Sequence, residues 1–285
     1  MVQIRGFLKW AGSKYNCLNQ IIPKLPPARR LIEPFTGSGV VFINTEYSSY
    51  LLAETNQDLV TIFTTLQNKG ESFIEYCKEY FIVENNVEDK YYSFRSHFNS
   101  LPTSDMKSAI FLYLNRHGYN GLCRYNSKGI YNVPFGLYVN PYFPKKEMLY
   151  FHKKSQNVQF TFSDFRKTFE LAEKGDIVYC DPPYVPLTEH TKAFAYTQNK
   201  FSLEDHIELA ELAKETASKG IPVIISNHDT EFTRHQYKTA TIHSFKVARW
   251  INCKANNRQP AKELLAVYDS KKTNIYNPSA STQGL

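Results

Sequence analysis

The sequence predicts an α/β protein with a doubly wound, mostly parallel sheet and a mainly helical segment inserted into it. Three observations indicate this fold. Short apolar runs end at acidic or turn residues, which is typical of central strands in a parallel sheet. A helical pattern separates the last two runs. Between about residues 56 and 143, helical patterns and stretches rich in Tyr, Asn and Gly replace the strands.

Four apolar runs are interpreted as strands. They cover residues 30–35, 50–53, 176–180 and 221–225, and they lead into Thr36-Gly37-Ser38-Gly39, Glu54, Asp181 and Ser226-Asn227-His228. Ser202 and Asp205 fit a capping box that begins a helix running to Gly220. Because the carboxyl ends of parallel strands meet at one edge of a sheet, we expect the residues that follow them to line one site.

The segment 56–143 is expected to form a second domain, inserted between residues 1–55 and 144–270 of the main domain. Residues 106–116 fit a helix, and Asn126 to Gly129 fit the turn of a β-hairpin. The polar residues 271–285 are expected to form a disordered tail.

The composition favours an anionic partner and a reducing compartment. The formal net charge of +7 suits nucleic acid, although many basic proteins bind none. The cysteines are scattered without a C-x-x-C pair, so we expect reduced thiols and neither a disulfide framework nor a zinc site. The sequence has no membrane-length apolar run and no signal-peptide apolar region. We therefore expect a cytoplasmic protein with no membrane partner and no metal.

A nucleotide-like cofactor is indicated by the small residues after the first strand. Gly37 and Gly39 allow a tight turn and the close approach of a ligand. Glu54 ends the next strand, where an acid can accept hydrogen bonds from ribose hydroxyls. Each feature alone is also explained by a simple tight turn or a solvated acid, and their combination favours the cofactor site.

The stretch Asp181-Pro182-Pro183-Tyr184 stiffens an acid and an aromatic ring at the end of an apolar strand. The Asp181 carboxylate can accept a hydrogen bond from an amino group. The Pro182 carbonyl can do the same, and Tyr184 offers a flat face. Together they predict a pocket for a planar ring that carries an amino group. The alternative is a proline-rich turn with no ligand.

These motifs resemble those of the alpha group of amino-group DNA methyltransferases, which use S-adenosylmethionine. FLKWAGSK, EPFTGSG, an inserted domain and DPPY follow one another in that group's order. LYLNRHGYNGLCRYN, YNVPFG, ISNHDT and ELLAVY narrow the resemblance to the Dam-type DNA adenine methyltransferases, over residues 7–268. The resemblance implies the S-adenosylmethionine-dependent methyltransferase fold. Residues 1–55 and 144–270 would bind the cofactor, and residues 56–143 would recognise DNA.

The resemblance also implies a role for each matching residue. Cofactor contacts would come from Trp10, Lys14, Glu33, Phe35, Gly37, Gly39, Glu54, Asp164, Phe165 and Asp181. Catalysis would rest on Asp181, Pro182 and Tyr184. DNA contacts would come from Lys9, Arg95, Arg116, Tyr119, Asn120, Leu122, Arg124, Asn126, Asn132, Pro134 and Tyr138. Without the resemblance, most of these would be interpreted as packed rings or solvated charges.

The implied reaction is methylation of the exocyclic N6 of an adenine flipped out of double-stranded GATC. Arg124 would pair with guanine in the major groove, and Leu122 and Pro134 would pack on a thymine methyl. Tyr119 would wedge into the base stack. The phosphate contacts would come from Arg95, Arg116, Asn126 and Asn132. Many relatives are basic where Leu137 stands, which leaves one backbone contact unassigned.

Other readings remain open. Cytosine-N4 enzymes would use the same chemistry, but they more often carry Ser in place of Asp181. Glutamine methyltransferases share the motif but would not explain the stretch 119–124. A silent DNA-binding regulator would not need both Asp181 and Tyr184. We expect a monomer acting on double-stranded DNA. The sequence does not decide between mismatch repair, replication or transcription control and restriction protection, nor between a bacterial and a phage source.

Overall fold

The computed structural model describes residues 3–185, 201–247 and 261–269. Within these residues, seven strands form one sheet in the order β3-β2-β1-β4-β5-β7-β6. They are β1 (Arg30–Glu33), β2 (Ser49–Glu54), β3 (Val158–Phe162), β4 (Asp176–Cys180), β5 (Val223–His228), β6 (Thr241–Val247) and β7 (Ala261–Tyr268). Strands β1, β4 and β5 run parallel, and β7 is antiparallel to both neighbours. The predicted α/β class with a mostly parallel sheet is confirmed.

The chain divides into two compact units. Unit 1 comprises Met1–Leu18, Thr36–Glu46 and Leu51–Phe162. Unit 2 comprises Asn19–Phe35, Tyr47–Tyr50 and Ser163–Leu285. Compactness alone defines these units, so the division into a catalytic and a DNA-recognition domain stays a prediction. The predicted disordered tail, 271–285, lies outside the described residues.

Unit 1 is built around helix α6 (Asp105–His117). Its residues from Ser108 to His117 are all buried, and the Ser104 side chain caps its first turn by accepting from the Lys107 amide at 3.2 Å. The α6 helix confirms the helix expected at residues 106–116. The other helical segments are η1 (Lys14–Cys17), α2 (Val40–Ile43), α3 (Gln57–Lys69), α4 (Glu71–Lys78), η3 (Val83–Asn85), α5 (Glu88–Ser100), η4 (Tyr119–Gly121), α7 (Lys145–Lys154) and η5 (Ser155–Asn157). Helices α3, α4 and α5 pack against α6.

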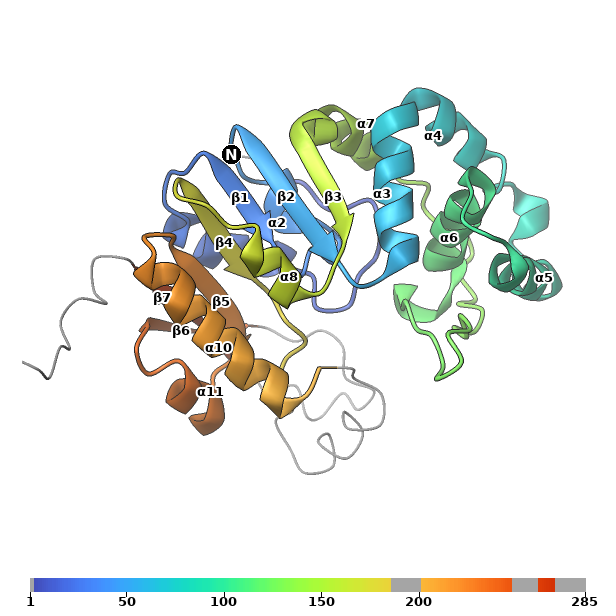
Figure 1. Cartoon of the computed structure of the whole chain (residues 1–285). Helices are drawn as coiled ribbons and strands as arrows, with labels where there is room; N and C mark the ends of the chain where they lie inside the picture. The colour runs from blue at the N-terminus through green and yellow to red at the C-terminus, as the bar shows by residue number, and fades with distance from the viewer. Residues whose placement is uncertain (1–2, 186–200, 248–260, 270–285) are drawn as a thin grey trace, which may run out of the picture. The chain divides into compact units, whose positions relative to one another are not determined.

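Unit 2 contains α1 (Leu18–Ile21, which begins at the last residue of unit 1), η2 (Ile22–Lys24), α8 (Phe165–Glu170), α10 (Leu203–Ser218) and α11 (Glu231–Gln236). The predicted capping box is present, with Ser202 at the N-cap and Asp205 three residues on. Helix α10 packs against β5, β7 and α8 (Figure 1). Strand β4 has the predicted bounds, and every one of its residues is buried.

The bounds predicted for β5 are wrong at both ends. The strand begins at Val223 because Pro222 has no amide hydrogen to donate. It continues through Ser226, Asn227 and His228, which had been placed after it. The cause is β7, whose antiparallel pairing covers β5 to His228. Three polar side chains therefore stand on a paired strand instead of a loop.

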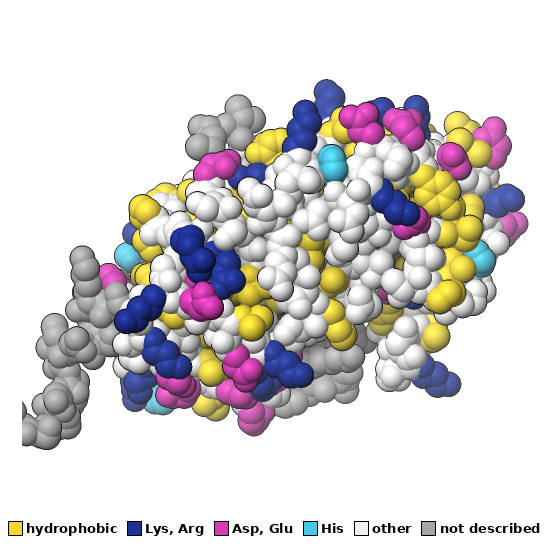
Figure 2. Space-filling model, turned by 45° about the horizontal axis from the view of Figure 1, so that its top comes forward, with side chains coloured by type: hydrophobic (Ala, Val, Ile, Leu, Met, Phe, Trp, Pro, Cys, Tyr) yellow, Lys and Arg dark blue, Asp and Glu magenta, His cyan; other side chains and the backbone are white. Residues whose placement is uncertain are grey.

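The surface gives two further findings. On the face drawn in Figure 2, Lys and Arg side chains lie among Asp and Glu side chains, so the net charge of +7 is not gathered into one basic patch there. Among the helices described, none is long and apolar enough to cross a membrane.

Candidate active site and nucleic-acid interface

In unit 2, strand β4 lies between β1 and β5, so the carboxyl ends of three parallel strands are neighbours. Strand β1 ends at the buried Glu33, and Phe35 follows two residues later. Strand β4 ends at Cys180, directly before Asp181. The structure therefore brings these predicted residues together at one edge, beside Ser226 of β5.

The Asp181 carboxylate is oriented from β5. The Ser226 hydroxyl donates to Asp181 Oδ1 at 2.8 Å and accepts a hydrogen bond from the Tyr179 hydroxyl at 3.2 Å. Ser226 and Tyr179 are buried, whereas Asp181 is partly exposed. Two buried hydroxyls therefore fix one oxygen of an acid whose side chain reaches the surface of the unit.

The Tyr184 ring is held from two sides. Its hydroxyl donates to Glu263 Oε2 of β7 at 3.0 Å, and its ring meets the His228 ring edge-on at a centroid distance of 4.7 Å. Burial, with the negative charges of Asp181 and Glu263, raises the pKa of Tyr184 well above its usual value. The hydroxyl therefore stays protonated and remains a donor.

The chain that leaves the motif is anchored as well. The Val185 amide donates to Asn227 Oδ1 at 3.3 Å, and the Val185 carbonyl accepts from His228 Nδ1 at 2.7 Å. Asn227 Nδ2 also donates to the Tyr237 hydroxyl at 3.1 Å. Pro182 is buried within this stretch. Residues 181–185 are thus fixed to β5 at both ends.

Aromatic rings form a second feature of unit 2. The Phe35 and Phe165 rings stack with centroids 5.6 Å apart, and Phe201 lies 5.5 Å from each. Phe35 and Phe165 were both expected to contact the cofactor, and the structure places them together. A cluster of flat apolar rings suits the packing of a heteroaromatic ring.

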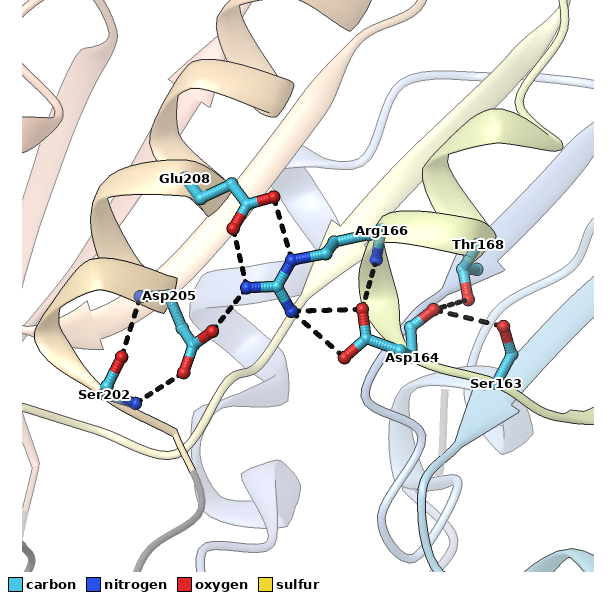
Figure 3. Close-up of polar contacts among 7 residues, drawn as sticks. All are labelled: Ser163, Asp164, Arg166, Thr168, Ser202, Asp205 and Glu208. Carbon is cyan, nitrogen blue, oxygen red and sulfur yellow. Dashed lines mark hydrogen bonds and ion pairs between the residues drawn. The ribbon is translucent and has the colours of Figure 1, made fainter.

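The Asp164 carboxylate is bound by a neighbouring guanidinium (Figure 3). Its Oδ1 accepts the Arg166 amide at 2.9 Å at the start of α8, and Arg166 Nη1 lies 3.2 Å from both carboxylate oxygens. Arg166 also forms ion pairs with Asp205 and Glu208 of α10. Asp164 is therefore half-buried in an ion-pair network that sequence reasoning missed.

In unit 1, the glycine turn is closed against Trp10 and Glu54. The Gly37 amide donates to Glu54 Oε2 at 3.1 Å, and Gly37 has a φ of 51°. A Cβ atom at this position would lie 3.0 Å from Trp10 Nε1. Burial raises the pKa of Glu54, while amide donors, with Gly37 first among them, oppose that rise. The turn thus presents bare backbone beside an acceptor carboxylate, which fits the ribose end of a nucleoside.

Two further cofactor candidates are placed by internal contacts. Lys14 is buried, and its ammonium group donates to the Gly12 carbonyl at 2.8 Å. Gly39 has a φ of 68° and begins α2, with its amide donating to the Thr36 carbonyl at 2.9 Å. Gly39 therefore shapes the turn, and Lys14 braces the preceding segment.

The Lys9 backbone is clamped by a buried amide. The Lys9 amide donates to Asn115 Oδ1 at 2.8 Å, and Asn115 Nδ2 donates to the Lys9 carbonyl at 2.8 Å. The Lys9 ammonium lies 4.0 Å from the centre of the Tyr138 ring. Burial and the nearby Arg116 charge lower the pKa of Lys9. Two DNA candidates, Lys9 and Tyr138, are thus neighbours.

The predicted turn at Asn126–Gly129 is present. Asn126 and Ile130 are joined by a backbone hydrogen bond of 2.9 Å. Arg124 projects from one arm into solvent, and its Nε donates to Asn132 Oδ1 on the other arm at 2.8 Å. The turn therefore presents an exposed guanidinium whose orientation is partly set.

The residues expected to wedge into the base stack or to contact a thymine methyl lie before and after this turn in the chain. Tyr119 is 47% exposed, and its backbone amide donates to the carbonyl of the exposed Pro134 at 2.9 Å. Asn120 is exposed with a φ of 53°. Leu122 is half-buried and accepts from the Tyr131 hydroxyl at 3.1 Å. Tyr119, Asn120 and Pro134 are thus open to a ligand.

The side chains expected to contact phosphate make internal hydrogen bonds. Arg116 is buried and donates to the Phe7 carbonyl, and its phosphate role stays a prediction. Arg95 donates to the Val133 carbonyl at 2.9 Å. Asn126 Oδ1 accepts two amides of its own turn, and Asn132 accepts from Arg124. Each of these four side chains thus has a hydrogen-bond partner within unit 1.

The chain belongs to a known class of enzymes. A family model described as D12 class N6 adenine-specific DNA methyltransferase matches residues 10–251. This chain is therefore a member of that class, an adenine-specific, S-adenosylmethionine-dependent DNA methyltransferase.

Curated relatives agree with this membership. The DNA adenine methylase of Escherichia coli (strain K12) is 44% identical over 268 residues, which is 94% of this chain and 96% of that protein. The Haemophilus influenzae DNA adenine methylase is 45% identical over 271 residues, or 94% and 95%. Among solved structures, a precorrin 8W decarboxylase covers 93% of this chain and 98% of its own at a TM-score of 0.39 and 10% identity, too distant to inform fold or function.

Sequence reasoning assigned no role to Ser226, Glu263 or Arg166. The first two lie in ISNHDT and ELLAVY, stretches that supported the resemblance, and Ser226 also follows the apolar run 221–225. An acid directly before an apolar run within a strand, as Glu263 is before residues 264–268, is a signal that could have found one of them. Arg166 could have been noticed from its two-residue spacing from Asp164.

Proposed function

We propose that this enzyme transfers the methyl group of S-adenosylmethionine to the exocyclic N6 of a flipped adenine in double-stranded GATC sites. The observation that carries the proposal is the Asp181 carboxylate, oriented by Ser226 at the carboxyl edge of β4 and followed by the fixed ring of Tyr184. The relatives' name, DNA adenine methylase, supports an adenine target.

The cofactor would be held by a carboxylate, a glycine turn and a pair of aromatic rings. Glu54 would accept hydrogen bonds from the ribose hydroxyls, and the turn at Gly37 would admit the nucleoside against bare backbone. Phe35 and Phe165 would pack on the adenine ring. When bound, S-adenosylmethionine supplies the methyl group as a carbon on a positively charged sulfur, and S-adenosylhomocysteine remains after transfer.

The chain's own chemistry acts on the target amino group. The Asp181 carboxylate and the Pro182 carbonyl would each accept one N6 hydrogen, which localises the nitrogen lone pair instead of leaving it delocalised into the ring. The proton that N6 loses can pass to Asp181. Tyr184 would stack on the base, a contact worth about 1–3 kcal/mol. Most of the acceleration would come from positioning.

Sequence readout is assigned to unit 1. The exposed Arg124 guanidinium would pair with a guanine in the major groove. Leu122 and Pro134 would contact the thymine methyl. Tyr119 would fill the space that the extruded adenine leaves, with Asn120 beside it, which offsets part of an extrusion cost of about a few kcal/mol.

The test uses labelled S-adenosylmethionine and two duplexes, one with a single GATC and one with GTAC in its place. Transfer to adenine in the first duplex alone is the expected result. Transfer to both duplexes would support methyltransferase activity but would rule out specificity for GATC. No transfer to either duplex while the cofactor still binds would indicate a recognition sequence other than GATC.

Salt dependence checks the backbone contacts separately. Affinity for the GATC duplex should fall steeply as salt rises, because neutralised phosphates release counterions. A flat dependence would show that this unit makes few phosphate contacts, which is the outcome that the internal bonding of Arg95, Arg116, Asn126 and Asn132 would produce if they keep those bonds on DNA.

A further inference from the structure

Ser226 contacts the proposed catalytic acid from outside the motif that carries it. It stands on β5, forty-five residues along the chain from Asp181, and only 1% of it is exposed. A buried side chain of this kind cannot contact DNA or cofactor directly. Its effect on the reaction must therefore pass through the residues that it touches.

The contacts of the Ser226 hydroxyl fix the direction of its hydrogen. The Tyr179 hydroxyl donates to Ser226 Oγ at 3.2 Å, so the Ser226 hydrogen points to another partner. Its acceptors include Asp181 Oδ1 at 2.8 Å and the Cys180 carbonyl at 3.3 Å. The shorter contact is to the carboxylate, which is also the stronger acceptor because it is ionised.

The Tyr179 hydroxyl, the Ser226 hydroxyl and Asp181 Oδ1 therefore form one line of hydrogen bonds, in which each hydroxyl donates toward the carboxylate. A chain of hydroxyls that all donate in one direction polarises each member and strengthens the last bond.

We propose that Ser226 is a positioning residue for methyl transfer, which fixes the rotation of the Asp181 carboxylate so that its outward oxygen meets the target amino group. This inference rests on the proposed function of Asp181. Tyr179 supports it by setting the direction in which Ser226 donates. Without the Ser226 hydroxyl, the carboxylate would sample other rotations and would meet the amino group in only a fraction of encounters.

The first variant is Ser226→Ala. Its single-turnover methylation rate should fall about 10- to 100-fold, the effect expected when a hydrogen bond to a charged group is lost. The KM values for DNA and S-adenosylmethionine should stay close to wild type, because neither ligand touches Ser226. Ser226→Thr, which keeps the hydroxyl, should recover most of the rate.

A readout independent of turnover separates positioning from base binding. A duplex with 2-aminopurine in place of the target adenine becomes more fluorescent when that base leaves the stack. Ser226→Ala should give the wild-type increase. A lost increase would place Ser226 in base extrusion and overturn the proposal.

Matched variants guard against an effect of folding alone. Ser108→Ala removes another buried serine hydroxyl, in α6 of unit 1, that has no hydrogen-bond partner within the described residues, and it should leave the rate unchanged. Tyr179→Phe keeps Ser226 but removes the hydroxyl that donates to it. The rate should fall about threefold, because the hydrogen bond from Ser226 to Asp181 becomes weaker. This variant remains informative if Ser226→Ala does not fold.

The outcomes distinguish this inference from the proposed function. If wild type methylates GATC and Ser226→Ala retains its rate, the positioning role is wrong and the function stands. If Ser226→Thr is as slow as the alanine variant while Tyr179→Phe matches wild type, the hydroxyl is not the cause. A wild-type enzyme that leaves GATC unmethylated contradicts the proposed function itself.

Discussion

In unit 2, Asp181 and Tyr184 are fixed by side chains of the neighbouring strands β5 and β7, whereas in unit 1 Arg124 and Tyr119 project from turns into solvent. The strand partners Ser226 and Glu263 are buried and bond to atoms of the proposed catalytic groups themselves. The turns of unit 1 are held by backbone and side-chain hydrogen bonds, and Arg124 and Tyr119 remain exposed on them.

This difference indicates which side chains are held in place before a ligand binds. Groups that act on a reacting nitrogen gain from being set before the substrate arrives. Groups that read a base edge can adjust to the duplex, since each contributes a separable amount of discrimination. Substitutions in unit 2 should therefore lower rate, and those in the turns of unit 1 should lower selectivity.

The largest expected effect is that of Asp181→Ala. Removing the acceptor for the N6 hydrogen should lower kcat by about 100- to 1,000-fold while DNA binding persists, as for loss of a preorganised electrostatic group. Single-turnover methylation and a gel-shift titration measure the two quantities. Asp89→Ala, which removes an exposed acid from α5, serves as control and should match wild type. Near-normal turnover in Asp181→Ala would remove this acid from the mechanism.

Acid should destabilise both units. Burial lowers the pKa of His117 in unit 1 and of His206 in unit 2 to about 4 each. Their unfolded forms therefore bind protons first as pH falls below about 6.5, and each histidine should cost about 2 kcal/mol of stability at pH 5. Stability is thus full above the unfolded pKa and declines towards pH 4.

Urea unfolding at pH 7 and pH 5 measures this loss. His206→Gln should make unfolding less sensitive to pH, whatever it does to stability at pH 7, because one of the two buried imidazoles no longer takes up a proton on unfolding. Equal pH sensitivity in the variant and the wild type would show that His206 titrates normally in the folded protein.

Arg124→Ala tests the expectation that the turns of unit 1 determine selectivity. The loss of a paired guanine contact should cost about 1–3 kcal/mol of discrimination between GATC and GTAC, measured as the ratio of kcat/KM values. The rate at saturating GATC should change little. Lys128→Ala removes a neighbouring exposed charge from the same turn and should weaken binding to both duplexes alike. A drop in kcat alone for Arg124→Ala would contradict its reading role.

Glu263→Gln is expected to give the smallest effect. Glutamine keeps an acceptor for the Tyr184 hydroxyl but removes the charge, so kcat should fall by about two- to tenfold. Glu215→Gln, an exposed exchange in α10, is the matched control. A larger fall than that of Ser226→Ala would shift the main positioning role from β5 to β7.

Local patterns predicted four of the seven strands described, β1, β2, β4 and β5, and did not predict β3, β6 and β7. The bounds of β4 follow from an apolar run closed by Asp181, and the start of α10 follows from Ser202 and Asp205. The role of Ser226 could not be predicted, because it depends on β4 and β5 lying side by side. The length of β5 was wrong for a related reason, since its pairing with β7 joins segments far apart in the chain.

A family resemblance indicates which residue type stands at a position, but it does not indicate which contacts that residue makes. It identified Arg116 as a basic residue in a DNA-binding region, and the structure shows its guanidinium buried against the Phe7 carbonyl. Leu137, where relatives are often basic, is 79% exposed. The exposure of a side chain and its hydrogen-bond partners decide whether it can contact a ligand or is engaged within the fold. Exposure and partners both depend on tertiary packing.

The clamp of Asn115 on Lys9 has a thermodynamic consequence. Lys9 and Trp10 are joined by a peptide bond, and on the proposed assignments one meets DNA while the other borders the cofactor turn at Gly37. Any coupling between the two ligands that passes along this backbone is reciprocal, so DNA would change the affinity for cofactor by the same factor by which cofactor changes the affinity for DNA.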